Sequence, residues 1–278
     1  MGTILVTGAG GYLGAQVLSA LRLAGHEAIG LTRRGGPGLN ACDLLDTRSL
    51  NQFMEKVKPS KLVHCAWESP KAAADYKDEA AAERSITMLD NVLDATSAPM
   101  LLISSMTVYE PRNCTRAYRE EDAVEPDNAY AWGKWAGEQH LYSRRRKGFS
   151  VRLPGLFGGG RQSGLVWNLA HALTLGDRPQ LPVRPLLWGA MDVRDAAHAI
   201  VRLCDVELAE AYPVNIGYAD TYSVSRLIAL LDELTGRTTL NDVDHPDFAF
   251  DLSRASELGA APHQTLRGAC LRLIRGDA

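Results

Sequence analysis

Short apolar runs alternate with amphipathic segments along the first half of the chain. The apolar runs have the length and composition of buried strands. They are Thr3 to Val6, Glu27 to Thr32, Lys61 to Cys65, Met100 to Ser104 and Phe149 to Leu153. The segments with helical spacing are Tyr12 to Leu23, Ser49 to Val57, Glu79 to Thr96 and Tyr130 to Lys147. This order predicts an α/β fold with a doubly wound parallel sheet and right-handed crossovers.

The pattern loosens after residue 153, where proline and glycine separate shorter elements. The predicted elements there are helices at Gly164 to Leu175, Arg194 to Leu203, Val224 to Leu234 and Gln264 to Ile274, and a strand at Pro213 to Ile216. We therefore expect residues 1–153 to form the sheet domain and residues 154–278 to form a smaller lobe, partly interleaved with it. No internal repeat or low-complexity linker separates the two parts.

A glycine-rich turn, Thr7-Gly8-Ala9-Gly10-Gly11-Tyr12-Leu13-Gly14, joins the first strand to the first helix. Gly8 permits a tight turn, Gly11 lets a pyrophosphate approach bare backbone, and Gly14 lets the helix pack closely on the strand. Such glycines also occur in ordinary turns, but this position between strand and helix favours a Rossmann-type dinucleotide site. The residues expected to contact the cofactor here are Gly8, Gly11, Tyr12, Leu13 and Gly14.

The end of the second strand bears on which dinucleotide binds. About 20 residues past the glycines, an NAD site carries an acidic residue that holds the ribose 2′-hydroxyl. This chain has Arg33 and Arg34 instead, and guanidinium groups bind phosphate well. We expect NADP as the cofactor, with NAD as the alternative if the two arginines are only solvated loop residues.

A tyrosine and a lysine, Tyr130 and Lys134, lie four residues apart on a predicted helix and so share one face. A nearby cation and a helix N-terminus both favour a phenolate, so we expect a lowered Tyr130 pKa. Asp127 or Asn128 is the expected helix cap. A Tyr-x-x-x-Lys pair alone is equally typical of a helix surface, so its meaning depends on its surroundings.

Those surroundings include Ser104-Ser105-Met106-Thr107-Val108-Tyr109, which places hydroxyl groups at the carboxyl end of a strand, where ligands of open α/β sheets bind. With these motifs the chain resembles the extended short-chain dehydrogenase/reductase family, of the epimerase/dehydratase type, over essentially its whole length. The other matching segments are Asp43-Leu44, His64-Cys65-Ala66, Arg152 to Gly158, Val193-Arg194-Asp195, Ser253-Arg254-Ala255 and Leu258-Gly259.

The resemblance implies roles for individual residues. Ser105 would hydrogen-bond the substrate oxygen, Tyr130 would transfer the hydroxyl proton, and Lys134 would bind the nicotinamide ribose and tune the tyrosine. Further cofactor contacts would come from Asp43, Leu44, Cys65, Ala66, Leu153 and Pro154. Asp43 as a helix cap and Cys65 as a core residue remain alternatives.

The chain also departs from the family pattern. Ser85 stands where an Asn is common, and Gly155 replaces an Asn with which nucleotide-sugar enzymes grip substrate phosphate. The loop Gly158 to Gly164 offers Arg161 to an anion or is a flexible connection. Asp192 and Trp188 are weaker candidates for the cleft. The residues expected to bound the substrate cleft are Glu68, Ser69, Thr107 and Arg161.

Composition narrows the class of protein. The 278 residues are 46% hydrophobic and 23% charged, with a net charge of −3, so no general basic surface for nucleic acid is expected. The run Arg144 to Lys147 reads as a solvated helix end. No apolar stretch reaches the length of a membrane span, and we expect a cytoplasmic protein.

Five scattered cysteines, without CxxC spacing, favour reduced thiols and no metal site. They are Cys42, Cys65, Cys114, Cys204 and Cys270.

Three functions fit these features. The first is an NADP-dependent reductase of a keto-sugar or similar carbonyl compound, possibly nucleotide-linked. The second is an NAD-dependent sugar epimerase, and the third is a catalytically silent dinucleotide sensor that binds a protein partner. The presence of Ser105, Tyr130 and Lys134 together argues against the third function, because a sensor without catalytic activity does not need these three residues. The resemblance also implies a homodimer through Glu79 to Thr96 and Tyr130 to Lys147.

Overall fold

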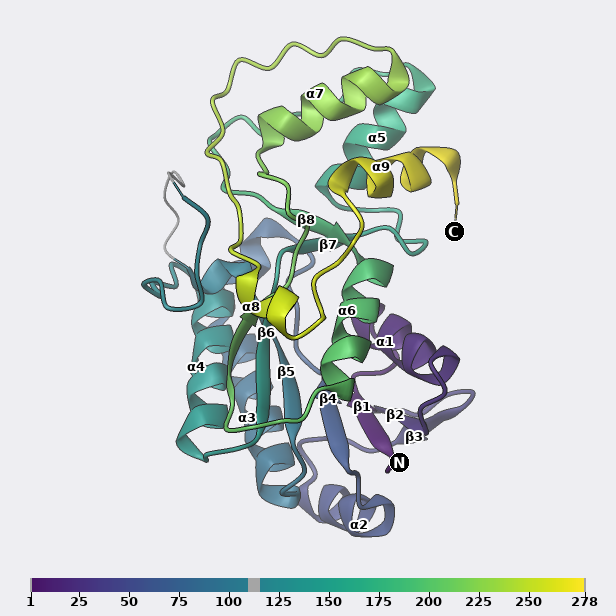
Figure 1. Cartoon of the computed structure of the whole chain (residues 1–278), viewed down its shortest axis with the longest axis vertical. Coiled ribbons are helices and arrows are strands. Elements are labelled where there is room, and N and C mark those ends of the chain that lie inside the picture. The colour runs from purple at the N-terminus through teal and green to yellow at the C-terminus, as the bar shows by residue number, and fades with distance from the viewer. Residues whose placement is uncertain (1, 110–115, 278) are drawn as a thin grey trace.

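The computed structural model describes residues 2–109 and 116–277, and its centre is a seven-stranded sheet in the order β3-β2-β1-β4-β5-β6-β9. All neighbouring strands in this sheet run parallel (Figure 1). The strands are β1 Ile4–Thr7, β2 Ala28–Thr32, β3 Leu39–Ala41, β4 Lys61–His64, β5 Met100–Ser105, β6 Gly148–Leu153 and β9 Tyr212–Asn215. The predicted α/β fold with a doubly wound parallel sheet is confirmed.

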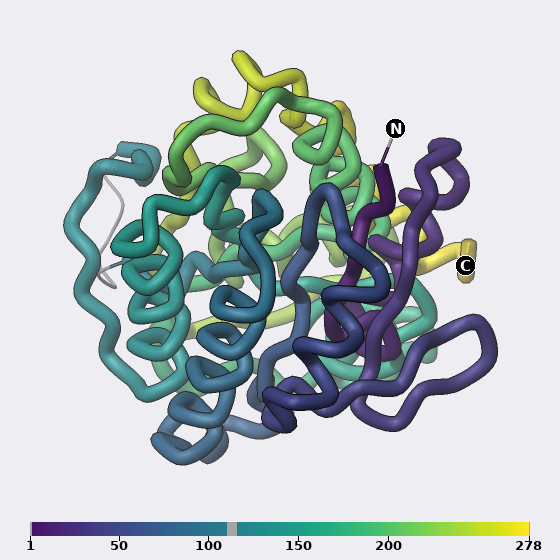
Figure 2. The backbone as a smooth tube through the Cα atoms, turned by 90° about the horizontal axis from the view of Figure 1, so that it is seen from below, coloured from purple at the N-terminus to yellow at the C-terminus, as the bar shows by residue number. Residues whose placement is uncertain are grey.

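Helices cover both faces of the sheet. Helix α1 packs against α6 on one face, whereas α3 packs against α2 and α4 on the other; Figure 2 shows the coils of α3 and α4 side by side. The helices are α1 Tyr12–Leu23, α2 Thr47–Val57, α3 Glu79–Ala95, α4 Ala129–Ser143, α5 Leu165–Leu175, α6 Val193–Asp205, α7 Val224–Thr235, α8 Ser253–Glu257 and α9 Leu266–Arg275, with 3₁₀ turns η1 Ala73–Lys77 and η2 Met106–Val108.

Successive residues of the central strands point into different cores. On β1, Leu5 belongs to the core under α2, α3 and α4, whereas Val6 belongs to the core under α1 and α6. Leu62 and Val63 on β4 divide in the same way. Because side chains alternate across a strand, strands covered on both faces read as continuous apolar runs, which is why these were visible in the sequence.

Some elements differ from the prediction. Helix α4 ends at Ser143 and not at Lys147, because Arg145 adopts φ +49 and closes the helix. The arginine run therefore follows the helix. Arg144 pairs with Asp90 and Asp94 on α3, which ties the end of α4 to its neighbour. The three-residue strands β3, β7 Gly155–Phe157 and β8 Ala190–Asp192 were not predicted, since so short a segment carries no periodicity.

The second half of the chain both extends the main sheet and builds a layer of its own. Strand β9 pairs with β6, and α6 covers the same face as α1. Helices α5, α7 and α9 pack together above this sheet, next to the two-stranded parallel sheet β7-β8 (Figure 1). The loop between β7 and α5 brings residues of this half down to the glycine-rich turn of the first half.

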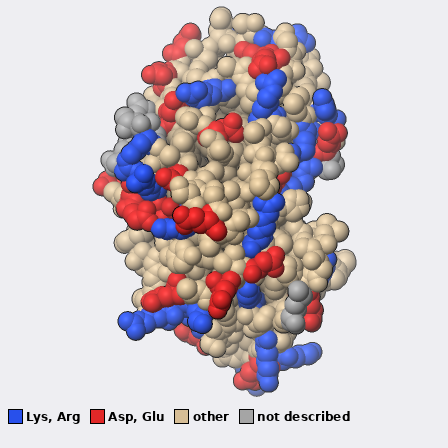
Figure 3. All heavy atoms as spheres, viewed as in Figure 1, with Lys and Arg blue, Asp and Glu red and all other residues tan. Residues whose placement is uncertain are grey.

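The outer surface carries mixed charge. On the face seen in Figure 3, blue and red side chains are interspersed rather than gathered into one region of a single sign. Within residues 2–109 and 116–277, no helix is both long and apolar enough to cross a membrane. Cys42, Cys65, Cys204 and Cys270 are free thiols, whereas Cys114 lies outside the described residues.

Candidate active site

The glycine-rich turn between β1 and α1 depends on small residues. Gly8 adopts φ +66, and a Cβ placed on it would lie 2.7–2.9 Å from backbone atoms of Cys65 and Ala66. A Cβ on Gly14 would lie 2.2 Å from the Gly8 carbonyl oxygen. Two backbone segments therefore meet at this turn with no space for a side chain, as a pyrophosphate-binding turn requires.

The N-terminus of α1 suits an anion. Its N-cap is Gly11, whose φ and ψ are extended and which provides no side-chain cap, and the first turn has no acidic residue. Unpaired N–H groups at a helix start attract a phosphate. The Tyr12 hydroxyl donates to the Gly158 carbonyl oxygen at 2.7 Å, and the exposed Arg161 guanidinium lies 5.0 Å from the centre of the Tyr12 ring. The loop after β7 thus brings a cation to this helix start.

The predicted adenosine contacts lie beside this turn. Arg33 and Arg34 follow β2 and are exposed. The Leu44 carbonyl accepts a hydrogen bond of 2.8 Å from the Asn91 amide on α3, which fastens the loop after β3. Asp43 does not cap α2, because Asp46 is the cap and Asp43 accepts from the Leu45 N–H. The helix-cap alternative for Asp43 is therefore wrong.

The predicted catalytic residues lie together at the carboxyl end of β5. Asn128 caps α4 by accepting from the Ala131 N–H at 2.9 Å, which places Tyr130 in the first turn. Of the two predicted caps, Asn128 is thus the one used. Ser105 ends β5 close to this turn and lowers the pKa of Tyr130, and the Ser105 hydroxyl accepts a hydrogen bond from the Thr107 hydroxyl at 3.0 Å.

Burial raises the pKa of Tyr130, the neighbouring Tyr76 raises it further, and the nearby Ser105 hydroxyl opposes both effects. The expected lowering of this pKa is wrong for the protein alone. Burial also lowers the pKa of Lys134 to about 7, which removes much of the positive charge that the expectation relied on. At neutral pH, Tyr130 therefore holds its proton and can act as an acid.

Lys134 is buried, and its ammonium nitrogen donates to the Ile103 carbonyl oxygen at 2.7 Å. The same nitrogen lies 4.0 Å from the centre of the Trp67 ring and 5.7 Å from that of Tyr130. Lys134 thus lies between the end of β5 and the segment after β4, on the α4 face that also carries Tyr130. The ribose-binding role implied by the resemblance stays a prediction.

A buried ion pair supports this helix from below. Glu138, on the Lys134 face of α4, accepts two hydrogen bonds from Arg152 on β6, at 3.0 and 2.7 Å. Arg152 also donates to the Tyr109 hydroxyl at 2.9 Å, and Tyr109 donates to Asn215 on β9 at 2.8 Å. This network joins three elements beneath the site.

Several of these residues are not predictable from local sequence patterns. Glu138 follows Lys134 by four residues, so the helical face was visible, but its partner Arg152 comes from another strand. Tyr76 contacts the Tyr130 ring edge to face at 5.5 Å between centres. Trp67 was detectable only indirectly, through Gly133 and Gly137, since glycines inside a helix usually have a packing reason.

The remaining predicted positions lie on both sides of the site. Leu153 is paired in register with Ser105, and Pro154 follows it, both buried. Glu68 and Ser69 are exposed, and the Glu68 carboxylate accepts two hydrogen bonds from Arg84.

The weaker candidates have structural partners. The Ser85 hydroxyl is buried and accepts from the Glu68 N–H at 3.0 Å. Asp192 caps α6, and Trp188 packs in the core, edge to face with Tyr222.

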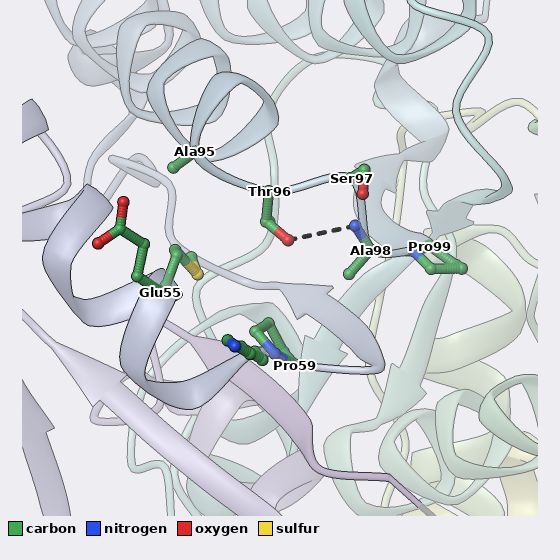
Figure 4. A pocket seen from close by; sticks show the side chains of 9 residues that line it. Glu55, Pro59, Ala95, Thr96, Ser97, Ala98 and Pro99 are labelled. Carbon is green, nitrogen blue, oxygen red and sulfur yellow. Dashed lines mark hydrogen bonds between the residues drawn. The ribbon is translucent and has the colours of Figure 1, made fainter.

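A hollow of about 500 Å³ lies elsewhere, between the ends of α2 and α3 (Figure 4). Glu55 and Lys58 line it on one side, and Thr96 and Pro99 on the other. These residues directly precede β4 and β5, so the hollow opens at the amino ends of the strands. Ser105 and Tyr130 lie at the carboxyl ends, and we place the functional site there.

Comparison with curated proteins gives two informative relatives. The chain is 30% identical over 159 residues to methionine adenosyltransferase 2 subunit beta from Pongo abelii, a match covering 56% of this chain and 47% of that protein. The chain thus spans about half the length of that relative. It is 25% identical over 228 residues to dTDP-4-dehydrorhamnose reductase from Mycolicibacterium smegmatis, covering 80% of this chain and 67% of that protein.

Among solved structures, UDP-glucose 4-epimerase from Thermus thermophilus in complex with NAD superposes with a TM-score of 0.79 at 18% identity, covering 99% of this chain and 100% of that one. At this identity the likeness concerns the fold. Residues 2–215 match the family model described as the RmlD substrate binding domain. With the motifs at Gly8 to Gly14 and at Tyr130 and Lys134, these findings confirm the resemblance to extended short-chain dehydrogenases/reductases, and the chain belongs to the RmlD substrate binding domain family.

Proposed function

We propose that this protein is an NADP-dependent reductase of a keto-sugar or similar polyhydroxylated carbonyl compound. The observation that carries the proposal is the grouping of Ser105, Tyr130 and Lys134 at the carboxyl end of β5. The Lys134 nitrogen donates to the Ile103 carbonyl oxygen on β5 and lies 5.7 Å from the centre of the Tyr130 ring, and Ser105 lowers the Tyr130 pKa. The matched dTDP-4-dehydrorhamnose reductase supports the reaction class. Gly155, in place of a phosphate-gripping Asn, favours a substrate that is not held through a nucleotide phosphate.

The residues at this site have different roles in the reduction of a carbonyl group. When bound, NADPH supplies a hydride to the carbonyl carbon. Tyr130 donates its proton to the carbonyl oxygen, and Ser105 orients that oxygen by a hydrogen bond. The residues that would hold the cofactor are the turn Gly8 to Gly14, Arg33 and Arg34, with Leu153 and Pro154 beside the nicotinamide. The start of α1 has no side-chain cap and no acidic residue in its first turn, and the turn before it has glycines where a side chain would not fit. Both features fit a bound pyrophosphate.

Two other functions remain as alternatives, each favoured by one comparison. An NAD-dependent sugar epimerase is favoured by the fold of the Thermus thermophilus epimerase, whose structure holds NAD. A dinucleotide-binding subunit of another enzyme is favoured by the match to a protein named as a subunit of methionine adenosyltransferase. The proposal also includes a cytoplasmic location and a homodimer. It further includes the division of the chain into a dinucleotide-binding domain, residues 1–153, and a substrate-binding lobe, residues 154–278.

The proposal is tested by purifying the protein and identifying any bound dinucleotide by mass spectrometry. Added NADPH should bind exchangeably, and dTDP-4-dehydrorhamnose and free keto-sugars should be compared as substrates by loss of absorbance of NADPH. Tightly bound NAD that survives purification would favour the epimerase instead. If NADP bound exchangeably but no substrate were turned over, and if the protein formed a stable complex with a second protein, the subunit function would be favoured. Binding of neither dinucleotide would contradict all three.

A further inference from the structure

Glu68 and Arg84 form an exposed ion pair near the predicted adenosine end of the site. The Arg84 guanidinium donates to both carboxylate oxygens, at 3.0 and 2.7 Å, so the two planar groups face each other. The side chains are 40% and 46% exposed, and exposed ion pairs contribute little to folding stability. This pair is therefore free to exchange partners without cost to the fold.

Arg84 lies on α3, the helix that also contacts one of the predicted adenosine residues. Helix α3 starts at the carboxyl ends of the strands, because it connects the end of β4 to the start of β5. Asn91 on this helix holds the carbonyl oxygen of Leu44. Arg84 precedes Asn91 by seven residues, about two turns, so it lies on the same face and nearer to the carboxyl edge of the sheet.

The charge of Arg33 also acts on the Glu68 carboxylate. Strands β2 and β4 flank β1, so Arg33 after β2 and Glu68 after β4 lie on opposite sides of the glycine-rich turn. Hydrogen bonds from Arg84 lower the pKa of Glu68, and the charge of Arg33 lowers it as well. The charges of two guanidinium groups thus act on one carboxylate at the edge of the sheet where the adenosine is predicted to bind.

We propose that Arg84 and Glu68 set the preference for NADP over NAD: Arg84 binds the adenosine 2′-phosphate together with Arg33, and Glu68 competes with that phosphate for Arg84. A phosphate dianion offers the same bidentate geometry to a guanidinium as a carboxylate does, with more charge. This inference rests on the proposed dinucleotide function. It moves Glu68 from the predicted substrate set to the cofactor site.

The two residues have opposite expected effects. Arg84→Ala removes a phosphate contact, so it should weaken NADP binding about fivefold or more and leave NAD binding unchanged. Glu68→Gln removes a negative charge that repels the phosphate, so it should strengthen NADP binding and leave NAD binding unchanged. Both effects should shrink at high salt, because exposed charges are screened.

Isothermal titration of NADP, NAD, 2′,5′-ADP and 5′-AMP tests these expectations on the full chain. A matched control is Arg267→Ala, because Arg267 on α9 also forms an exposed bidentate pair, with Glu233, at 2.7 and 2.9 Å. The control should bind all four ligands like the unaltered protein. Thermal unfolding of each variant checks that the fold is retained.

The result that supports the inference is weaker binding of NADP and 2′,5′-ADP alone in Arg84→Ala, with the reverse change in Glu68→Gln. Equal weakening of all four ligands would assign Arg84 to the adenine or the 5′-phosphate and overturn the inference, as would no change. If the unaltered protein bound neither NAD nor NADP, the proposed function itself would fail, and this result is distinct from a failure of Arg84 alone.

Discussion

The ammonium nitrogen of Lys134 lies 4.0 Å from the centre of the Trp67 indole ring. Two glycines of α4 face the indole and the side chains of α3: a Cβ on Gly133 would lie 3.1 Å from Ala82 and 3.4 Å from Trp67, and one on Gly137 would lie 3.2 Å from Leu89 and 3.3 Å from Trp67. Glycine inside a helix costs roughly 1 kcal/mol relative to alanine, so the close packing of α4 on α3 and Trp67 is formed at some expense of helix stability. Trp67 therefore packs against the Lys134 amino group of the predicted active site.

Replacing Lys134 with Met should weaken dinucleotide binding and also slow turnover. The ammonium is proposed both to contact the ribose and to act beside Tyr130, so one substitution removes two interactions. Titration of NADP and steady-state rates, measured on the same preparation, separate the two effects. A loss of rate with unchanged NADP affinity would contradict the double role.

The stability of the protein should depend on pH through Lys134. Burial lowers the pKa of Lys134 from 10.5 to about 7. Between these values the unfolded chain binds a proton that the native protein lacks, so native stability should rise with pH by up to about 1.4 kcal/mol per pH unit. Below pH 7 both states are protonated, and the cost of burying the charge is fully present.

Urea unfolding of the unaltered protein and of Lys134→Met, from pH 6 to pH 10, measures this difference. As the pH rises, the free energy of unfolding of the unaltered protein should increase relative to that of the variant. Parallel curves for the two proteins would show that Lys134 keeps its charge in the fold.

Tyr130→Phe should reduce turnover by roughly 10²–10⁴-fold, as expected for loss of a general acid, and leave NADP affinity nearly intact. The matched control is Tyr142→Phe, because Tyr142 lies on the same helix but bonds Ser150 and Glu138, away from Ser105. NADPH oxidation measures the rate, and titration measures the affinity. Near-normal turnover in Tyr130→Phe would remove the catalytic assignment.

Glu138→Gln should destabilise the protein strongly. Glu138 and Arg152 are both buried, and removing one charge leaves the other without compensation, a loss of about 3–5 kcal/mol. Asp247→Asn is a suitable control, since Asp247 forms an exposed pair with Arg226 and its loss should change stability little. Urea denaturation measures both variants. If both variants lost only a small and similar free energy of unfolding, the buried network of Glu138 and Arg152 would not stabilise α4.

The unaltered protein should bind NADP about ten- to a hundredfold tighter than NAD, because a charge-assisted contact to phosphate contributes roughly 1.5–3 kcal/mol. Arg33→Asp should reverse the preference, since the new carboxylate repels the 2′-phosphate and accepts a hydrogen bond from the free 2′-hydroxyl. Titration of both cofactors checks this. Equal or tighter binding of NAD by the unaltered protein would leave Arg33 and Arg34 as solvated loop residues.

The sequence by itself determined the main strands and helices, because strands buried on both faces are continuous apolar runs and their helices are amphipathic. It also determined the glycine-rich turn, since the positive φ of Gly8 and the close contact of Gly14 with the Gly8 carbonyl oxygen both arise within one strand-turn-helix unit. The contact of Gly8 with the backbone of Cys65 and Ala66 comes from the neighbouring strand. Tyr130 and Lys134 were identifiable for the same reason: their relation is local, four residues along one helix. Local spacing is readable from the chain alone.

Only the tertiary structure decided which distant residues meet. Arg152 joins Glu138, Trp67 packs on Lys134, and Arg84 pairs with Glu68, and each of these contacts depends on the order of strands and the packing of helices. Charge states were decided in the same way. The pKa of Tyr130 rises and that of Lys134 falls because desolvation is a property of the assembled core, which no spacing along the chain can express.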